Sequence, residues 1–66
     1  MFRLTFDTDN SAFGDDPKAE SARILLSVIN DLSLGKLHGT LRDFNGNSVG
    51  MWELLSEDKV GYAMED

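Results

Sequence analysis

Residues 41–54, which read LRDFNGNSVGMWEL, constrain the fold of this chain more than any other segment. The dipeptide Asn45-Gly46 favours a two-residue type I′ turn, in which both residues adopt positive φ, and apolar residues alternate on either side of it. With this turn, each large side chain on one face of the hairpin meets a glycine or another apolar residue. These pairs are Leu41 with Gly50, Gly39 with Trp52, and Leu37 with Leu54. The sequence therefore predicts a β-hairpin over residues 37–54.

The register of this hairpin depends on the number of residues in its turn. A four-residue turn keeps every side chain on the same face as a two-residue turn, because side chains alternate with a period of two. A three-residue turn would place Leu37 opposite Glu53, which is a poorer match. We therefore expect an even-numbered turn, and it also fixes the pairs on the second face. These are Arg42 with Val49, Thr40 with Met51, and His38 with Glu53.

Gly46 and Gly50 raise one alternative, because glycines four residues apart can form a loop that cradles a phosphate. Such a loop is followed by the start of a helix and commonly by a lysine. Here strand-forming residues follow instead, and the two glycines fit none of the nucleotide-binding patterns. The pattern favours the hairpin.

The residues before the hairpin indicate a strand, a loop and a helix. Phe2, Leu4 and Phe6 alternate with polar residues and predict a strand over residues 1–7. Residues 8–15 are rich in Asp, Asn, Ser and Gly and are typical of a loop. The Asp16-Pro17 pair predicts the start of a helix over residues 16–34, and Gly35 is placed to end it.

The predicted helix has an apolar stripe at helical spacing, and we expect this stripe to pack on the sheet. The stripe contains Ala22, Leu25, Leu26, Ile29 and Leu32, and Val28 widens it. Polar and charged residues occupy the opposite side, and we expect them to face solvent. These residues are Glu20, Arg23, Ser27 and Asp31.

The expected fold class is α+β, with the order β-α-β-β in a single domain over residues 1–66. One helix covers one face of a small, mainly antiparallel sheet. The first strand lies beside either the third or the second strand, and the sequence does not choose between them. Residues 55–66 form a turn followed by either a fourth strand or a tail, because Val60, Tyr62 and Met64 alternate.

The charge of the chain bears on its partners. Twelve acidic residues against six basic ones give a formal charge of −6, which disfavours direct binding to nucleic acid or anionic lipid. No apolar run approaches the ~20 residues of a membrane span, and the N-terminal residues do not resemble a signal peptide. We therefore expect a cytoplasmic protein whose partner is a protein with a basic surface.

The acidic residues form two groups that are candidates for binding this partner. The first gathers at one end of the molecule, because the first strand ends where the hairpin turns; it contains Asp7, Asp9, Asp15, Asp16 and Asp43. The second lies in the C-terminal segment and contains Glu57, Asp58, Glu65 and Asp66. DNA presents one negative charge per ~1.7 Å of its axis, so a fixed array of carboxylates can occupy a cleft built for DNA.

Metal binding and catalysis are both disfavoured by the residue pattern. Asp7-Thr8-Asp9 resembles the start of a calcium-binding loop, but Ala12 replaces the glycine and Lys18 replaces the bidentate glutamate that such a loop needs. His38 is the only histidine, and no Ser or Cys nucleophile accompanies it. We expect an exposed His38–Glu53 pair, no cofactor and no enzymatic activity.

Three apolar residues are expected on the second face of the hairpin, away from the helix: Phe44, Val49 and Met51. Either the C-terminal segment covers them or they form an apolar contact patch for a partner. The sequence leaves both alternatives open.

The strand that ends in D-T-D-N, the Ala/Leu/Ile helix and the motif G-x-L-R-D-x-N-G-N-x-V-G-x-W-E at residues 39–53 resemble short proteins encoded by bacteriophages and prophages. The resemblance covers residues 2–54, and its most specific part is the hairpin motif. It implies an inhibitor of host defence or of host nucleic-acid machinery, with small acidic anti-CRISPR proteins as one such class. The target would then be a CRISPR effector or surveillance complex in the host cytoplasm. The alternative is a structural or accessory phage protein that binds another protein through the hairpin face.

Overall fold

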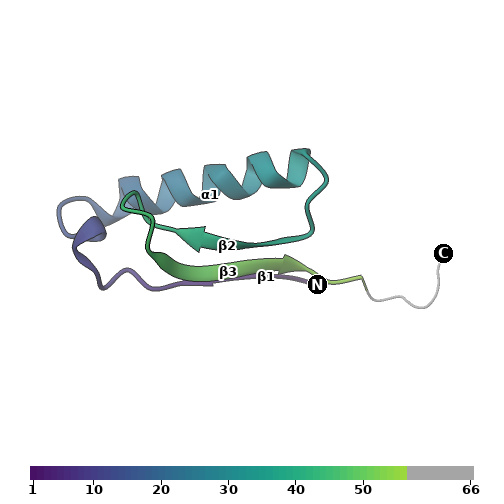
Figure 1. The fold of residues 1–66 in the computed structure, drawn as a ribbon, viewed down its shortest axis with the longest axis horizontal. Coiled ribbons are helices and arrows are strands. Elements are labelled where there is room, and N and C mark those ends of the chain that lie inside the picture. The colour runs from purple at the N-terminus through teal and green to yellow at the C-terminus, as the bar shows by residue number, and fades with distance from the viewer. Residues whose placement is uncertain (57–66) are drawn as a thin grey trace.

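In a computed structural model, which describes residues 1–56, one helix lies over one face of a three-stranded antiparallel sheet (Figure 1). The elements are β1 (Phe2–Phe6), the short 3₁₀ turn η1 (Ser11–Phe13), α1 (Pro17–Ser33), β2 (His38–Arg42) and β3 (Ser48–Leu54). The sheet order is β1-β3-β2, so the first strand lies beside the third. The predicted α+β class is confirmed, whereas the fourth strand predicted from Val60, Tyr62 and Met64 lies outside the described residues. No helix within residues 1–56 is long and apolar enough to span a membrane.

The hairpin turn contains three residues rather than the even number expected. The Asp43 N–H donates to the carbonyl of Asn47, and the Gly46 N–H donates to the carbonyl of Asp43, both at 3.0 Å. These bonds leave residues 44–46 as the loop, with Gly46 at a φ of +87°. This pattern is that of a turn closed by a residue in the left-handed conformation, which glycine adopts without a steric penalty. The predicted two-residue type I′ turn is therefore wrong.

The predicted register is nevertheless present, because a β-bulge follows the turn. Arg42 pairs with Ser48 while Leu41 pairs with Gly50, so Val49 is an extra residue on β3. The three-residue loop moves the pairing by one residue, and the bulge moves it back by one, so the pairs beyond the bulge are the predicted ones. The predicted Arg42–Val49 pair is wrong. The predicted pairs that are confirmed are Leu41–Gly50, Thr40–Met51, Gly39–Trp52 and His38–Glu53.

Both ends of α1 are formed by the residues that the sequence predicted. The Asp16 carboxylate accepts a hydrogen bond from the Ala19 N–H at 3.1 Å, and Pro17 occupies the first helical position. At the other end Gly35 has a φ of +90°, its N–H donates to Leu32, and the Lys36 N–H donates to Asp31. These two bonds form a Schellman motif, which satisfies the last carbonyls of the helix.

The hydrophobic core lies between α1, η1 and the helix-facing side of the sheet. Trp52 is fully buried at its centre, the Phe2 ring stacks on the Trp52 indole at 5.8 Å, and the Phe13 ring stacks on Phe6 at 6.1 Å. The buried apolar residues are Ala12, Phe13, Ile24, Val28, Leu41 and Trp52. A core of this size is thin, as expected for a chain of 66 residues.

The face of α1 that packs on the sheet is not the predicted one. Glu20, Ile24 and Val28 are buried, whereas Leu26 and Ile29 are 64% and 61% exposed. Of the other residues in the predicted apolar stripe, Val28 is buried as expected, but three more are exposed: Ala22, Leu25 and Leu32. The helix is therefore rotated relative to the prediction, so that its longest apolar stripe faces away from the sheet. Polar contacts between α1 and the hairpin loop, described next, hold it in this orientation.

Candidate protein-binding site

The end of β1, the hairpin loop and the start of α1 lie together at one end of the molecule (Figure 1). The Asp7 N–H donates to the Val49 carbonyl at 2.9 Å, which continues the β1–β3 pairing past the end of the strand. The Asn10 side chain then donates to Asp43 Oδ2 at 2.8 Å. These bonds attach residues 7–10 to the hairpin and fix the position of the loop that precedes α1.

Asp43 is buried within the hairpin loop, and its side chain is only 3% exposed. Its Oδ1 accepts from the N–H groups of Asn45 and Asn47, both at 2.9 Å. Its Oδ2 accepts from the side chains of Asn10 at 2.8 Å and Asn47 at 3.2 Å. The expectation that Asp43 joins an exposed acidic surface is therefore wrong. A carboxylate is needed here because four donors converge on a group that presents only acceptors.

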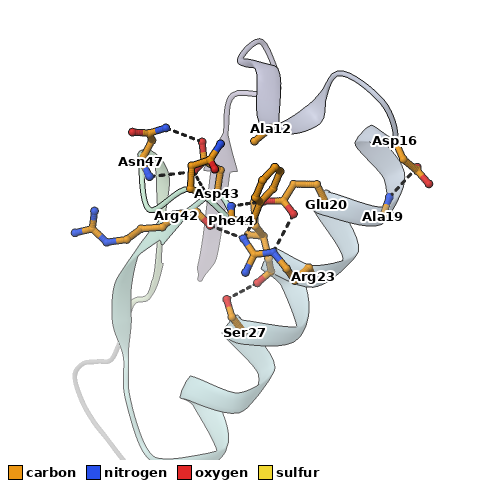
Figure 2. A network of polar contacts seen from close by, with 12 residues as sticks. Ala12, Asp16, Ala19, Glu20, Arg23, Ser27, Arg42, Asp43, Phe44 and Asn47 are labelled. Carbon is orange, nitrogen blue, oxygen red and sulfur yellow. Dashed lines mark hydrogen bonds and ion pairs between the residues drawn. The ribbon is translucent and has the colours of Figure 1, made fainter.

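Glu20 and Arg23 connect α1 to the hairpin loop (Figure 2). The Glu20 carboxylate accepts two hydrogen bonds from Arg23, both at 2.9 Å, and one from the Phe44 N–H at 2.8 Å. The Arg23 guanidinium also donates to the Arg42 carbonyl at 2.8 Å. Both side chains were predicted on the solvent side, because their spacing in the sequence indicates an ion pair but not a partner in the hairpin. These contacts explain why this face of α1 turns inward.

The surrounding groups lower the pKa of the Glu20 and Asp43 carboxyl groups. The hydrogen bonds from Arg23 have the largest effect on Glu20 and lower its pKa below 4.5, although burial opposes them. The same contact raises the pKa of Arg23. Burial has the largest single effect on Asp43 and would raise its pKa, but the bonds from Asn47, Asn45 and Asn10 outweigh it and lower the pKa below 3.8.

These shifts predict a loss of stability in acid. A carboxyl group with a lower pKa in the folded state stabilises the fold above its unfolded pKa, and that stabilisation disappears as the pH falls through the folded-state pKa. The free energy of unfolding of the parent, measured by urea titration, should fall steadily below about pH 4.5. Glu20→Gln and Asp43→Asn should be less stable than the parent at pH 7, and the difference should shrink towards pH 2.

The matched control for this experiment is Asp9→Asn, which removes an exposed carboxylate that forms no hydrogen bond or ion pair within residues 1–56. It should leave the free energy of unfolding at pH 7 close to that of the parent, as is usual for a substitution at an exposed surface position. A constant difference between Glu20→Gln and the parent from pH 7 to pH 2 would contradict the assignment of the lowered pKa to Glu20.

The exposed acidic residues at this end differ from the other carboxylates that the structure describes. Glu20, Asp31 and Glu53 form ion pairs with Arg23, Lys36 and Arg3 respectively, and Asp43 is enclosed by its loop. The four that remain form no ion pair within residues 1–56, and all are exposed: Asp7, Asp9, Asp15 and Asp16. We call these four the acidic end. Unpaired negative charge in the described part of the chain is therefore concentrated there, and Lys18 in the first turn of α1 offsets one unit of it.

A hollow of about 350 Å³ opens beside the acidic end. Its lining combines carboxylates, the Arg23 guanidinium that pairs with Glu20, a hydroxyl, small apolar side chains and an aromatic ring that is 62% exposed. These come from Ser11, Ala12, Asp15, Asp16, Ala19, Glu20, Arg23 and Phe44. Figure 2 shows the Phe44 ring between Ala12 and Arg23, so the Glu20–Arg23 pair forms part of the wall. A lysine or arginine side chain suits this lining, because its stem can contact Phe44 while its charge meets Asp15 and Asp16.

The three apolar residues expected to share the second face of the hairpin lie in different surroundings. Phe44 lines the hollow beside α1, Val49 packs against the hydrophobic core, and Met51 lies on the sheet face opposite the helix. The bulge that makes Val49 an extra residue explains this separation. The second acidic group lies outside the described residues, so the structure does not place it: Glu57, Asp58, Glu65 and Asp66.

His38 lies opposite Glu53 as predicted, but the Glu53 carboxylate forms an ion pair with Arg3 on β1. The Arg3 Nε donates to Glu53 Oε2 at 3.1 Å. Residues 1–56 contain no group of three or more His, Asp or Glu side chains placed to hold a metal ion.

Comparisons with protein-family models, with curated proteins and with solved structures give no match to this chain. The function must therefore be argued from the charges and contacts of the acidic end.

Proposed function

We propose that this chain is a non-enzymatic binding protein that docks its acidic end on a basic, nucleic-acid-binding surface of another protein and blocks that surface. The observation that carries the proposal is the concentration at one end of four exposed carboxylates that have no ion-pair partner among residues 1–56. Their positions are constrained by the contacts that attach the loop to the hairpin and cap α1. A surface that evolved to hold phosphates attracts such an array, and the attraction accelerates association.

The hollow adds a means of selecting the partner. Long-range charge attraction alone favours any basic surface. The hollow beside the acidic end, by contrast, favours a partner that has one basic side chain at a fixed distance from its other basic groups. An arginine fits the combination of ring and carboxylates especially well, because its planar head can stack on Phe44 while it donates to Asp15 or Asp16. We therefore expect the partner to insert an arginine at this point.

The class of partner follows from the resemblance of residues 2–54 to short phage and prophage proteins. We propose a phage-type inhibitor that acts in the host cytoplasm on a nucleic-acid-binding complex, with a CRISPR surveillance complex as the first target to test. The alternative of an accessory protein that binds through the hairpin face is less well supported, because Phe44, Val49 and Met51 do not lie in common surroundings.

The test is displacement of a labelled DNA duplex from the purified surveillance complex. The parent chain should displace DNA, and the apparent affinity should fall steeply between about 0.05 M and about 0.5 M salt, because exposed charges are screened. A variant with Asp7, Asp9, Asp15 and Asp16 all changed to Asn should bind about 4-fold to 1,000-fold more weakly, since four exposed charges at about 0.2–1 kcal/mol each contribute about 0.8–4 kcal/mol. Asn at position 16 keeps the helix cap while removing the charge.

The matched control changes Glu57, Asp58, Glu65 and Asp66 to their amides. Both variants move the formal charge from −6 to −2, because each removes four negative charges. Only the variant of the acidic end should lose affinity if that end makes the contact. Equal losses in both variants would show that net charge alone drives binding. No displacement of DNA by the parent at low salt would overturn the surveillance complex as the target.

A further inference from the structure

The outer face of α1, which points away from the sheet, carries no charged residue from Ala19 to Ser33. Its apolar side chains recur at positions 22, 25, 26, 29 and 32, which is the heptad spacing of helices that pair with other helices. Three of the four large ones are more than two-fifths exposed: Leu25 at 44%, Leu26 at 64% and Ile29 at 61%. We call Ala22, Leu25, Leu26, Ile29 and Leu32 the outer stripe.

The charged residues of the same stretch of helix are directed towards the rest of the chain. Glu20 and Arg23 contact the hairpin loop, and Asp31 forms an ion pair with Lys36 at 3.7 Å. A surface helix usually packs its longest apolar stripe inward, whereas α1 packs Glu20, Ile24 and Val28 inward and leaves the outer stripe exposed. The inward polar contacts thus leave the outer stripe without a covering layer among residues 1–56.

We propose that two copies of this chain pair through the outer stripes of their α1 helices in an antiparallel arrangement. The lack of charge on the stripe requires an uncharged, apolar surface opposite it, and an identical helix supplies one. The stripe is also self-complementary in size, because antiparallel packing about a twofold axis near its centre sets the small Ala22 against a large residue of the second copy.

Charge decides the direction of the pairing. In a parallel pair the two acidic ends would lie side by side, and the unpaired carboxylates would repel one another. In an antiparallel pair they lie at opposite ends, and each helix N-terminus approaches the C-terminus of the other helix, which favours the arrangement. This inference does not depend on the proposed function, because it uses only the outer stripe and the location of the acidic end.

The expected dimer is a weak one. A helix of 17 residues is about 26 Å long, so a contact made by one helix from each copy falls at the small end of stable interfaces. We therefore expect a dissociation constant in the micromolar range and a melting temperature that rises with protein concentration. The core, in which six apolar residues among residues 1–56 are buried, is thin and gains stability from such a contact.

Sedimentation equilibrium of the full chain from about 5 µM to about 1 mM tests the proposal, since this range brackets a micromolar constant. Leu26→Lys and Ile29→Lys should each raise the dissociation constant at least about tenfold, while circular dichroism shows an intact fold. Leu34→Lys is the matched control, because Leu34 is 68% exposed and lies off the stripe at the helix C-cap. It adds the same charge and should leave the dissociation constant unchanged.

Two results would overturn the proposal. One is a parent chain that remains monomeric at the highest concentration. The other is a dimer that persists unchanged in both lysine variants, which would place the contact elsewhere.

Variants with one introduced cysteine test whether the two helices pair in the antiparallel direction. They are unambiguous because the sequence itself contains no cysteine. In an antiparallel pair a cysteine at position 25 or 26, near the centre of the stripe, should form a disulfide-linked dimer, whereas Ala22→Cys and Leu32→Cys at its ends should not. In a parallel pair all positions would crosslink, and that result would reject the antiparallel arrangement.

Discussion

Gly50→Ala should unfold the protein or leave only a small folded fraction at 25 °C. A Cβ atom at this position would overlap the Thr5 carbonyl oxygen and lie 2.6 Å from the Cα of Phe6. Both obstacles belong to the backbone of β1, so rotation of a side chain cannot relieve them. Accommodation requires β1 to move away from β3, which breaks the hydrogen bonds around the Phe6–Gly50 pair. A domain of 66 residues has a total stability of about 3–10 kcal/mol and cannot absorb such a loss.

Far-UV circular dichroism and urea titration measure this effect. Met51→Ala is the control, because Met51 is the next residue on β3 and lies on the sheet face opposite the helix. It should cost about 1 kcal/mol or less, as is typical of a substitution at a partly exposed position. If Gly50→Ala melted at the temperature of the parent, the close approach of β1 to β3 at this position would be wrong.

Trp52→Ala should cost about 3–5 kcal/mol, because it removes the largest fully buried side chain in the described core. The indole lies against the bare backbone of Gly39, where a Cβ atom would sit 2.8 Å from Trp52 Nε1. Phe2 would also lose the ring on which it stacks. The expected result is a chain without a cooperative thermal transition, measured by differential scanning calorimetry and by circular dichroism.

A double-mutant cycle isolates the contact between Trp52 and Gly39. Gly39→Ala should be destabilising in the parent, because the added methyl group meets the indole nitrogen. In a Trp52→Phe background the nitrogen is absent, so the same substitution should cost less. Trp52→Phe also removes a buried N–H that has no hydrogen-bond partner within residues 1–56, which offsets part of the lost packing. Equal costs of Gly39→Ala in the two backgrounds would contradict the observed packing of the indole.

The hairpin register was predictable from the sequence although the turn was not. Side-chain size identifies which residues must face one another, and the Gly39–Trp52 and Leu41–Gly50 pairs satisfy that requirement. Turn length is a separate choice, because a three-residue loop with a bulge yields the same faces as a two-residue loop without one. The three-residue loop is stabilised by Asp43, which accepts hydrogen bonds from the N–H groups of Asn45 and Asn47, and the alternation of side chains along the strands gives no sign of these bonds.

The orientation of α1 was not predictable from its periodicity. Helical spacing identifies which residues share a face of the helix. To decide which face packs on the sheet, the prediction must assume that it is the most apolar one. Here Glu20 bonds to the Phe44 N–H and Arg23 bonds to the Arg42 carbonyl, and both partners lie more than 18 positions later in the chain. Ile24 and Val28 supply enough apolar surface to complete that face. The burial of Asp43 escaped prediction for the same reason, since its Asn10 partner belongs to another segment.

The pairing of β1 with β3 determines when the chain can fold. Arg3 lies opposite Glu53, 50 positions later, so the central strand stays incomplete until both ends of the described segment are available. The helix and the hairpin involve only near neighbours and form on the microsecond scale, whereas closure of this long loop is the slow step. During synthesis the sheet cannot be completed until residue 54 has left the ribosome. The three-stranded sheet of residues 1–56 is therefore completed only after β3 has been translated, whereas the helix can form earlier.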